Sequence, residues 1–156
     1  MTYPFSTPNR VTKYEVIEEV PRRAMVIFAH PDDAEIGAGA IAALWAANGT
    51  EITYVQCTTG SSGSNDLAMI SDRIVEIRAT EQRAAADAIG VGDIVALDHP
   101  DGELDADRVF LGEIVHALRK YRPEVVFTHD QNRTNGFQHR DHRSVGITVQ
   151  DAIYPY

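Results

Sequence analysis

Four short apolar runs along the chain alternate with longer segments that carry apolar residues at helical spacing. The run from Met25 to Ala29 is uninterrupted, as in strands that are buried on both faces of a parallel sheet. The predicted strands cover residues 24–29, 51–57, 93–97 and 124–128. Strands that alternate with helices form right-handed βαβ units, so we expect an α/β fold with a mostly parallel sheet covered on both faces.

The sequence predicts four helices, and the first three are marked by a stop or capping signal. They cover residues 36–47, 72–89, about 105–122 and 139–156. Asn48-Gly49, Gly90 and Pro123 act as stop signals, and Asp105 is the expected N-cap of the third helix. The residues expected to face inward are Ile74, Ile77, Ala84 and Ala88, then Phe110, Ile114, Ala117, Leu118 and Tyr121, and finally Val145, Val149 and Ile153.

Polar residues follow the first and the fourth strand at their carboxyl ends, where open parallel sheets bind ligands. His30, Asp32 and Asp33 come directly after the first strand, and His139 and His142 follow the fourth after a loop. Zinc accepts imidazole nitrogen and carboxylate oxygen, and its catalytic sites use three protein ligands and keep one position for water. His30, Asp33 and His142 fit that count and predict a metal site.

The neighbouring polar residues suit acid–base chemistry beside such a metal. Asp32 can take the proton of a metal-bound water. His139, if protonated, can stabilise charge on an amide oxygen or protonate the departing amine. Asp141 can hold His139 or a ligand histidine in its working tautomer, or it is a plain carboxylate at a helix N-terminus. Each cluster alone is also consistent with ordinary capping and turn residues.

Two loops follow strand ends and can form walls of a pocket. The first, residues 58–65, is rich in Gly and Ser and is either a flexible connection or part of a substrate site. The second, residues 129–138, joins the fourth strand to the second histidine cluster. Cys57, the only cysteine, precludes an internal disulfide and is expected to be a small buried hydrophobe.

Composition narrows the classes of partner. The net charge of −9 argues against nucleic acid, because that affinity comes mainly from clustered Lys and Arg. No apolar stretch reaches the roughly 18 residues of a membrane span. The first 21 residues lack the apolar centre of a signal peptide, so we expect a cytoplasmic protein that acts on a small molecule.

Four motifs in order carry a family resemblance. They are Ala29-His30-Pro31-Asp32-Asp33-Ala34-Glu35, Glu76-Ile77-Arg78-Ala79-Thr80-Glu81, Pro100-Asp101-Gly102-Glu103-Leu104 and His139-Arg140-Asp141-His142-Arg143. From about residue 24 onward the chain resembles the PIG-L-type, LmbE-like zinc-dependent N-acetylglucosaminyl deacetylases. The resemblance implies a three-layer α/β/α Rossmann-like fold, with residues 24–156 as the deacetylase domain and residues 1–23 as an N-terminal extension.

The resemblance also implies roles for individual residues. His30, Asp33 and His142 would bind Zn²⁺, Asp32 would be the general base, and His139 would stabilise the oxyanion or protonate the amine. Arg78 matches an arginine that the family uses near the substrate, although an ion pair with Glu81 also explains it. The implied reaction removes an acetyl group from an N-acetylglucosamine-type small molecule.

Several alternatives stay open. Family members usually continue further, so we expect that the chain lacks their C-terminal portion and that an exposed sheet edge or helix face favours self-association. Such a chain can bind zinc without turnover. A non-haem iron enzyme that uses His30, Asp32 and His142 would normally be an all-β barrel. A dinucleotide-binding module at Gly37 and Gly39 would lack its third glycine.

Overall fold

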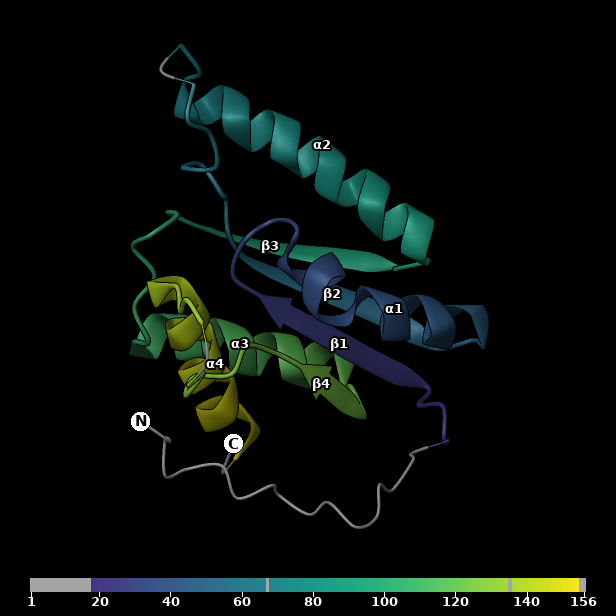
Figure 1. Ribbon diagram of the computed structural model, residues 1–156. Coiled ribbons are helices and arrows are strands. Elements are labelled where there is room, and N and C mark those ends of the chain that lie inside the picture. Colours follow the sequence, from purple (N-terminus) through teal and green to yellow (C-terminus); the bar gives the residue numbers. More distant parts are fainter. Residues whose placement is uncertain (1–17, 67, 135, 155–156) are drawn as a thin grey trace, which may run out of the picture.

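The computed structural model describes residues 18–66, 68–134 and 136–154, in which four strands alternate with four helices (Figure 1). The elements are β1 (Arg23–Phe28), α1 (Asp33–Ala47), β2 (Glu51–Thr58), α2 (Ser71–Ile89), β3 (Asp93–His99), α3 (Arg108–Tyr121), β4 (Val125–Phe127) and α4 (Arg140–Ile153). The predicted α/β class is therefore confirmed. Residues 1–17 of the expected N-terminal extension lie outside the described residues.

The strand order β3-β2-β1-β4 places β1 inside the sheet, and all three strand pairs are parallel. The chain moves outward from β1 through β2 to β3 and then returns to β4 on the other side of β1. Ala24 of β1, for example, is paired with both Ile52 and Val125. This reversal creates a switch point at the carboxyl ends of β1 and β4, which is where open α/β sheets bind ligands.

Two apolar layers cover the sheet, α1 and α2 on one face and α3 and α4 on the other (Figure 1). Successive side chains of β1 point to opposite faces because a strand has a period of two. Met25 and Ile27 thus pack in the core beneath α3 and α4, while Val26 and Phe28 pack beneath α1 and α2. Both faces being buried explains the uninterrupted apolar run. Cys57 is fully buried in the first of these cores, as expected.

The predicted inward face of α2 is partly wrong. Ala84 and Ala88 are exposed, whereas Ile74, Gln82 and Ala86 are buried. The buried positions follow an i, i+4 stripe that also contains Arg78, so two polar residues occupy the inward face near the carboxyl end of the sheet. The prediction looked for apolar residues at helical spacing, so it could not identify an inward face on which two of the four positions are polar.

Two helix ends also differ from expectation. The N-cap of α3 is Asp107, not Asp105, because the Asp107 carboxylate accepts the N–H groups of Val109 and Phe110 at 2.9 Å each. Asp105 instead forms an ion pair with Arg140. At the end of α4, Ile153 is exposed and Ala152 is buried in its place. In the described part of the chain, no helix has the combined length and apolarity of a membrane crossing.

Ile114 tests the packing of the α3 and α4 layer. We expect Ile114→Ala to lower the free energy of unfolding by about 2–5 kcal/mol, because the side chain is fully buried and its truncation leaves a cavity. Urea denaturation followed by circular dichroism measures the change. Ile153→Ala is the matched control, since Ile153 is 54% exposed and should change stability by only about 0.5 kcal/mol. Equal losses in the two variants would contradict this packing.

Candidate metal centre

Three predicted ligand residues converge at the switch point between β1 and β4. His30 follows β1, Asp33 opens α1, and His142 lies in the first turn of α4. His30 Nδ1 is 3.3 Å from Asp33 Oδ2 and 3.3 Å from His142 Nε2. His142 Nε2 is 3.2 Å from the same Asp33 oxygen. The three donor atoms therefore form a nearly equilateral triangle, with side chains that are only 12–23% exposed.

The dimensions of this triangle fit a divalent metal ion. Ligand distances of about 2.0–2.1 Å in a tetrahedral zinc site correspond to ligand–ligand separations of roughly 3.3–3.4 Å. The observed separations are 3.2–3.3 Å. Two imidazole nitrogens and one carboxylate oxygen also form the type of donor set that catalytic zinc sites use, with a fourth position left for water.

Asp33 is held in its charged form by the groups around it. Its Oδ2 accepts the backbone N–H of His30 at 2.8 Å, which folds the side chain back onto the end of β1. Burial alone would raise the pKa of Asp33, but the neighbouring imidazoles of His129, His142 and His30 and this N–H more than offset it. The pKa of Asp33 is therefore far below its usual value, and the carboxylate is ready to bind a cation.

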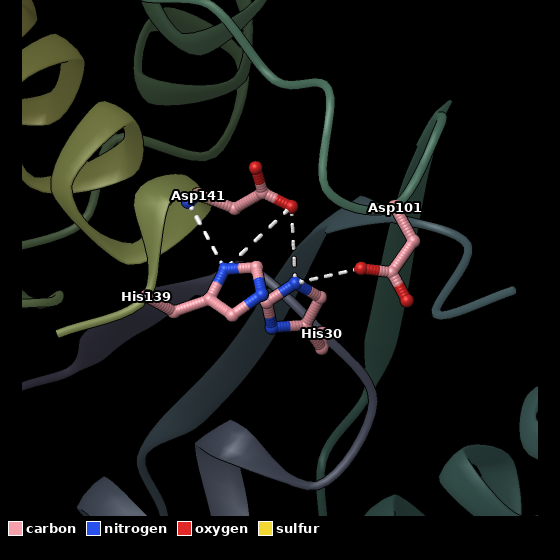
Figure 2. Close-up of side chains that lie close together, drawn as sticks. All are labelled: His30, Asp101, His139 and Asp141. Carbon is pink, nitrogen blue, oxygen red and sulfur yellow. Dashed lines mark hydrogen bonds and ion pairs between the residues drawn. The ribbon is translucent and has the colours of Figure 1, made fainter. Parts of the chain in front are cut away.

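The opposite nitrogen of His30 contacts two further carboxylates (Figure 2). His30 Nε2 is 3.1 Å from Asp141 Oδ2 and 3.2 Å from Asp101 Oδ1. A carboxylate that accepts the Nε2 proton leaves the Nδ1 lone pair free to point at the triangle. Burial lowers the pKa of His30, but the hydrogen bonds to Asp33 and Asp141 outweigh burial and leave the pKa raised.

Asp141 is completely buried and joins the loop after β3 to α4. Besides His30, its Oδ2 accepts the N–H of Gly102 at 2.7 Å, and its Oδ1 accepts the N–H of Leu104 at 3.3 Å. The sequence left open whether Asp141 orients His139 or a ligand histidine, or is only a carboxylate at a helix N-terminus. The geometry favours contact with a ligand histidine. The Asp141 oxygen is 3.1 Å from His30 and 4.0 Å from His139 Nδ1.

His139 is the N-cap of α4, and its protonation state follows from that position. Its Nδ1 accepts the backbone N–H of Asp141 at 3.1 Å. A backbone amide can only donate, so Nδ1 is an acceptor and the proton of the neutral ring lies on Nε2. The ring packs edge-on against His30, with centroids 4.5 Å apart (Figure 2). His139 therefore offers an N–H donor beside the metal triangle.

Asp32 lies beside the triangle but does not belong to it. Its side chain is 65% exposed, and Oδ2 accepts from Arg78 Nη2 at 3.1 Å. In the described residues, the groups that could hold a metal contain Asp33, Asp101 or Asp141 but not Asp32. The backbone of Asp32 has φ 90°, a left-handed conformation that costs a non-glycine residue about 1–3 kcal/mol. Such strain is typical of functional sites.

Arg78 ties the metal motif to the Gly/Ser-rich loop after β2. Its guanidinium donates to the carbonyl oxygens of Pro31 at 2.5 Å and Gly60 at 3.1 Å, as well as to Asp32. Gly60 has φ 66°, and a methyl group there would lie 2.8 Å from Pro31 Cδ as well as 2.6 Å from Arg78 Nη1, so the position favours glycine. The same loop is joined to Asp101, which accepts the N–H of Ser62 at 3.0 Å. The loop is therefore built into the site.

His129, after β4, is a site residue that the sequence analysis missed. Its ring stacks on His142 at a centroid distance of 4.0 Å, and its Nε2 accepts the N–H of Ala29 at 3.1 Å. A methyl group on Gly146 of α4 would lie 2.6 Å from the His129 carbonyl oxygen. Gly146, in the middle of a helix, is the sequence signal that could have indicated this close approach of the loop.

Removal of one triangle residue tests the metal site. We expect His142→Ala to lose stoichiometric divalent metal, because two remaining ligands hold a catalytic metal poorly. Elemental analysis of protein purified without chelator measures the metal-to-protein ratio. His116→Ala, an exposed histidine on α3, is the matched control and should keep the wild-type ratio. Full metal content in His142→Ala would refute its role as a ligand.

The sequence and the fold of this chain are similar to those of known proteins. Residues 25–153 match the family model for PIG-L, GlcNAc-PI de-N-acetylase. The chain is 34% identical over 147 residues to 1D-myo-inositol 2-acetamido-2-deoxy-alpha-D-glucopyranoside deacetylase 1 of Catenulispora acidiphila, covering 78% of this chain and 45% of that protein. The structure of N,N'-diacetylchitobiose deacetylase from Pyrococcus horikoshii superimposes with a TM-score of 0.82 at 30% identity, covering 85% of this chain and 49% of that one.

The same fold also occurs in GalB, the 4-carboxy-2-hydroxymuconate hydratase of Pseudomonas putida KT2440, with a TM-score of 0.75 at 26% identity. That match covers 84% of this chain and 55% of GalB. The chain spans about half the length of the relatives that it matches. Because the family model covers nearly all of it, with the metal triangle and the Arg78 loop inside the matched region, the chain belongs to the PIG-L family of LmbE-like deacetylases.

Proposed function

We propose that the protein is a zinc-dependent hydrolase that removes an acetyl group from an N-acetylglucosamine-type small molecule. The observation that carries the proposal is the triangle of His30, Asp33 and His142, with Asp32 directly beside it. Deacetylation is also the activity in the names of relatives that are at least 30% identical to the chain. The triangle supplies a place for the metal, and Asp32 supplies a base next to it.

The proposed chemistry divides the work between the metal and the side chains. A zinc ion held by His30, Asp33 and His142 would lower the pKa of a water to about 7 and polarise the amide carbonyl. Asp32 takes the proton of the attacking water, and burial raises the pKa of its carboxyl against the opposing effect of Arg78, which makes it a stronger base. Asp32 is therefore the group that moves the proton.

His139 and Asp141 have different roles beside the metal triangle. The Nε2–H of His139 donates to the amide oxygen as negative charge develops there. Asp141 keeps the Nε2 proton of His30 in place and so fixes the direction of the His30 lone pair. Arg78 would lie near the substrate, and its contact with Asp32 supports that role.

A zinc-binding chain without turnover is the alternative that must be tested. The assay is release of a primary amine from N-acetylglucosamine conjugates, followed with zinc-loaded protein and with protein treated with a chelator. We expect release only from the loaded protein. Metal binding without amine release from sugar, cyclitol or chito-oligosaccharide conjugates would favour the alternative. Iron rather than zinc in the purified protein would argue for oxygenase chemistry instead.

Asp32→Asn separates the base from the metal site. We expect this variant to keep its zinc and to lose about a hundredfold or more in kcat, because an amide cannot accept the proton of the attacking water. Asp151→Asn, on the exposed side of α4, is the matched control and should keep the wild-type kcat. Turnover that is unchanged in Asp32→Asn would remove Asp32 from the role of base.

A further inference from the structure

Gln82 is a buried polar residue that neither the motifs nor the proposed chemistry explains. It lies on the inward stripe of α2 and is only 3% exposed. Its carboxamide makes two hydrogen bonds, both to the segment that follows β1. Oε1 accepts the backbone N–H of Asp32 at 3.0 Å, and Nε2 donates to Glu35 Oε1 at 3.0 Å. A buried amide with both ends satisfied has a defined orientation.

The backbone that Gln82 holds is strained. Asp32 is in the left-handed region and is the N-cap of α1, so its N–H has no acceptor within the helix and needs a partner outside it. In the described residues, the partner of that N–H is the side-chain oxygen of Gln82. Arg78, one turn earlier on α2, holds the Asp32 carboxylate and the Pro31 carbonyl oxygen. α2 therefore holds both the backbone and the side chain of Asp32.

Glu35 sets the orientation of the Gln82 amide. An ionised carboxylate accepts and cannot donate, so the amide must present its NH₂ group to Glu35 and its oxygen to Asp32. Glu35 also lies beside the hydroxyl of the fully buried Tyr54, and burial together with this carboxylate raises the pKa of Tyr54. A cavity of about 200 Å³ borders Asp32, Glu35 and Gln82, so side chains of similar length fit in place of Gln82.

We infer that Gln82 is a positioning residue for the general base: its carboxamide, oriented by Glu35, fixes the strained backbone of Asp32 and thereby the direction of the Asp32 carboxylate. The inference rests on the proposed function for its effect on turnover, but the hydrogen bond itself does not depend on that function. Displacement of a reacting group by about 1 Å can cost roughly a hundredfold in rate. A residue that never touches the substrate can therefore control kcat.

The first test needs no enzymatic activity. In Gln82→Met, which keeps the length but removes both hydrogen bonds, we expect the Asp32 amide to exchange with deuterium about tenfold faster in NMR experiments. The matched control is Gln150→Met on the exposed face of α4, which should leave that exchange rate unchanged. An unchanged Asp32 exchange rate in Gln82→Met would overturn the inference, whether or not the protein is a deacetylase.

The second test uses a reversed pair. Gln82→Glu alone places two carboxylates about 3 Å apart and should impair the enzyme, because like charges repel. Adding Glu35→Gln restores a donor opposite an acceptor while position 82 still accepts the Asp32 N–H. We expect the double variant to recover both the slow amide exchange and the kcat. Failure of the pair to recover the exchange rate would contradict the proposed orientation.

The third test asks whether Gln82 acts through Asp32. We expect Gln82→Met to lower kcat by roughly ten- to a hundredfold, with KM and zinc content unchanged. In an Asp32→Asn background the same substitution should have little further effect, because the base is already lost. Additive losses would overturn the positioning role. If the wild-type protein shows no turnover but the amide exchange rates are as expected, the proposed function is refuted and the hydrogen bond from Asp32 to Gln82 is still supported.

Discussion

The site depends on the hydrogen bonds that the buried carboxylate of Asp141 accepts. The carboxylate accepts from His30 and from the N–H groups of Gly102 and Leu104, and thus connects the end of β1, the loop after β3 and the start of α4. A fully buried charge is tolerated only when several hydrogen bonds satisfy it. The need to satisfy Asp141 therefore brings three distant segments together, and the metal triangle forms where they meet.

The strands and the meeting of the two histidine clusters could be predicted because both follow from simple rules. Apolar runs mark buried strands, and parallel strands place their carboxyl ends at one edge. Helix boundaries were less accessible: α1 starts at Asp33, three residues before the predicted start, because the Asp33 side chain both opens the helix and faces the triangle. Asp33 is polar because it belongs to the site, and a polar residue at this position does not show the apolar spacing from which the start of a helix is predicted.

Gln82 and His129 show why part of a site escapes sequence analysis. Each is a single polar residue whose role depends on a contact between elements that are far apart in the sequence. Neither helical nor strand periodicity carries information about such contacts. Indirect signals exist, since Gly60 and Gly146 each sit where a side chain would collide with a site segment. Glycines that are unexplained by turns can thus point to neighbours of a site.

The left-handed backbone of Asp32 lowers the stability of the fold at the position that carries the carboxylate beside the metal triangle. Asp32 is one of three described non-glycine residues with positive φ, and glycine would adopt this conformation at no steric cost. Glycine at position 32 would relieve the backbone strain but would also remove the carboxylate that accepts from Arg78, so the strain is the cost of carrying a side chain at this point of the turn.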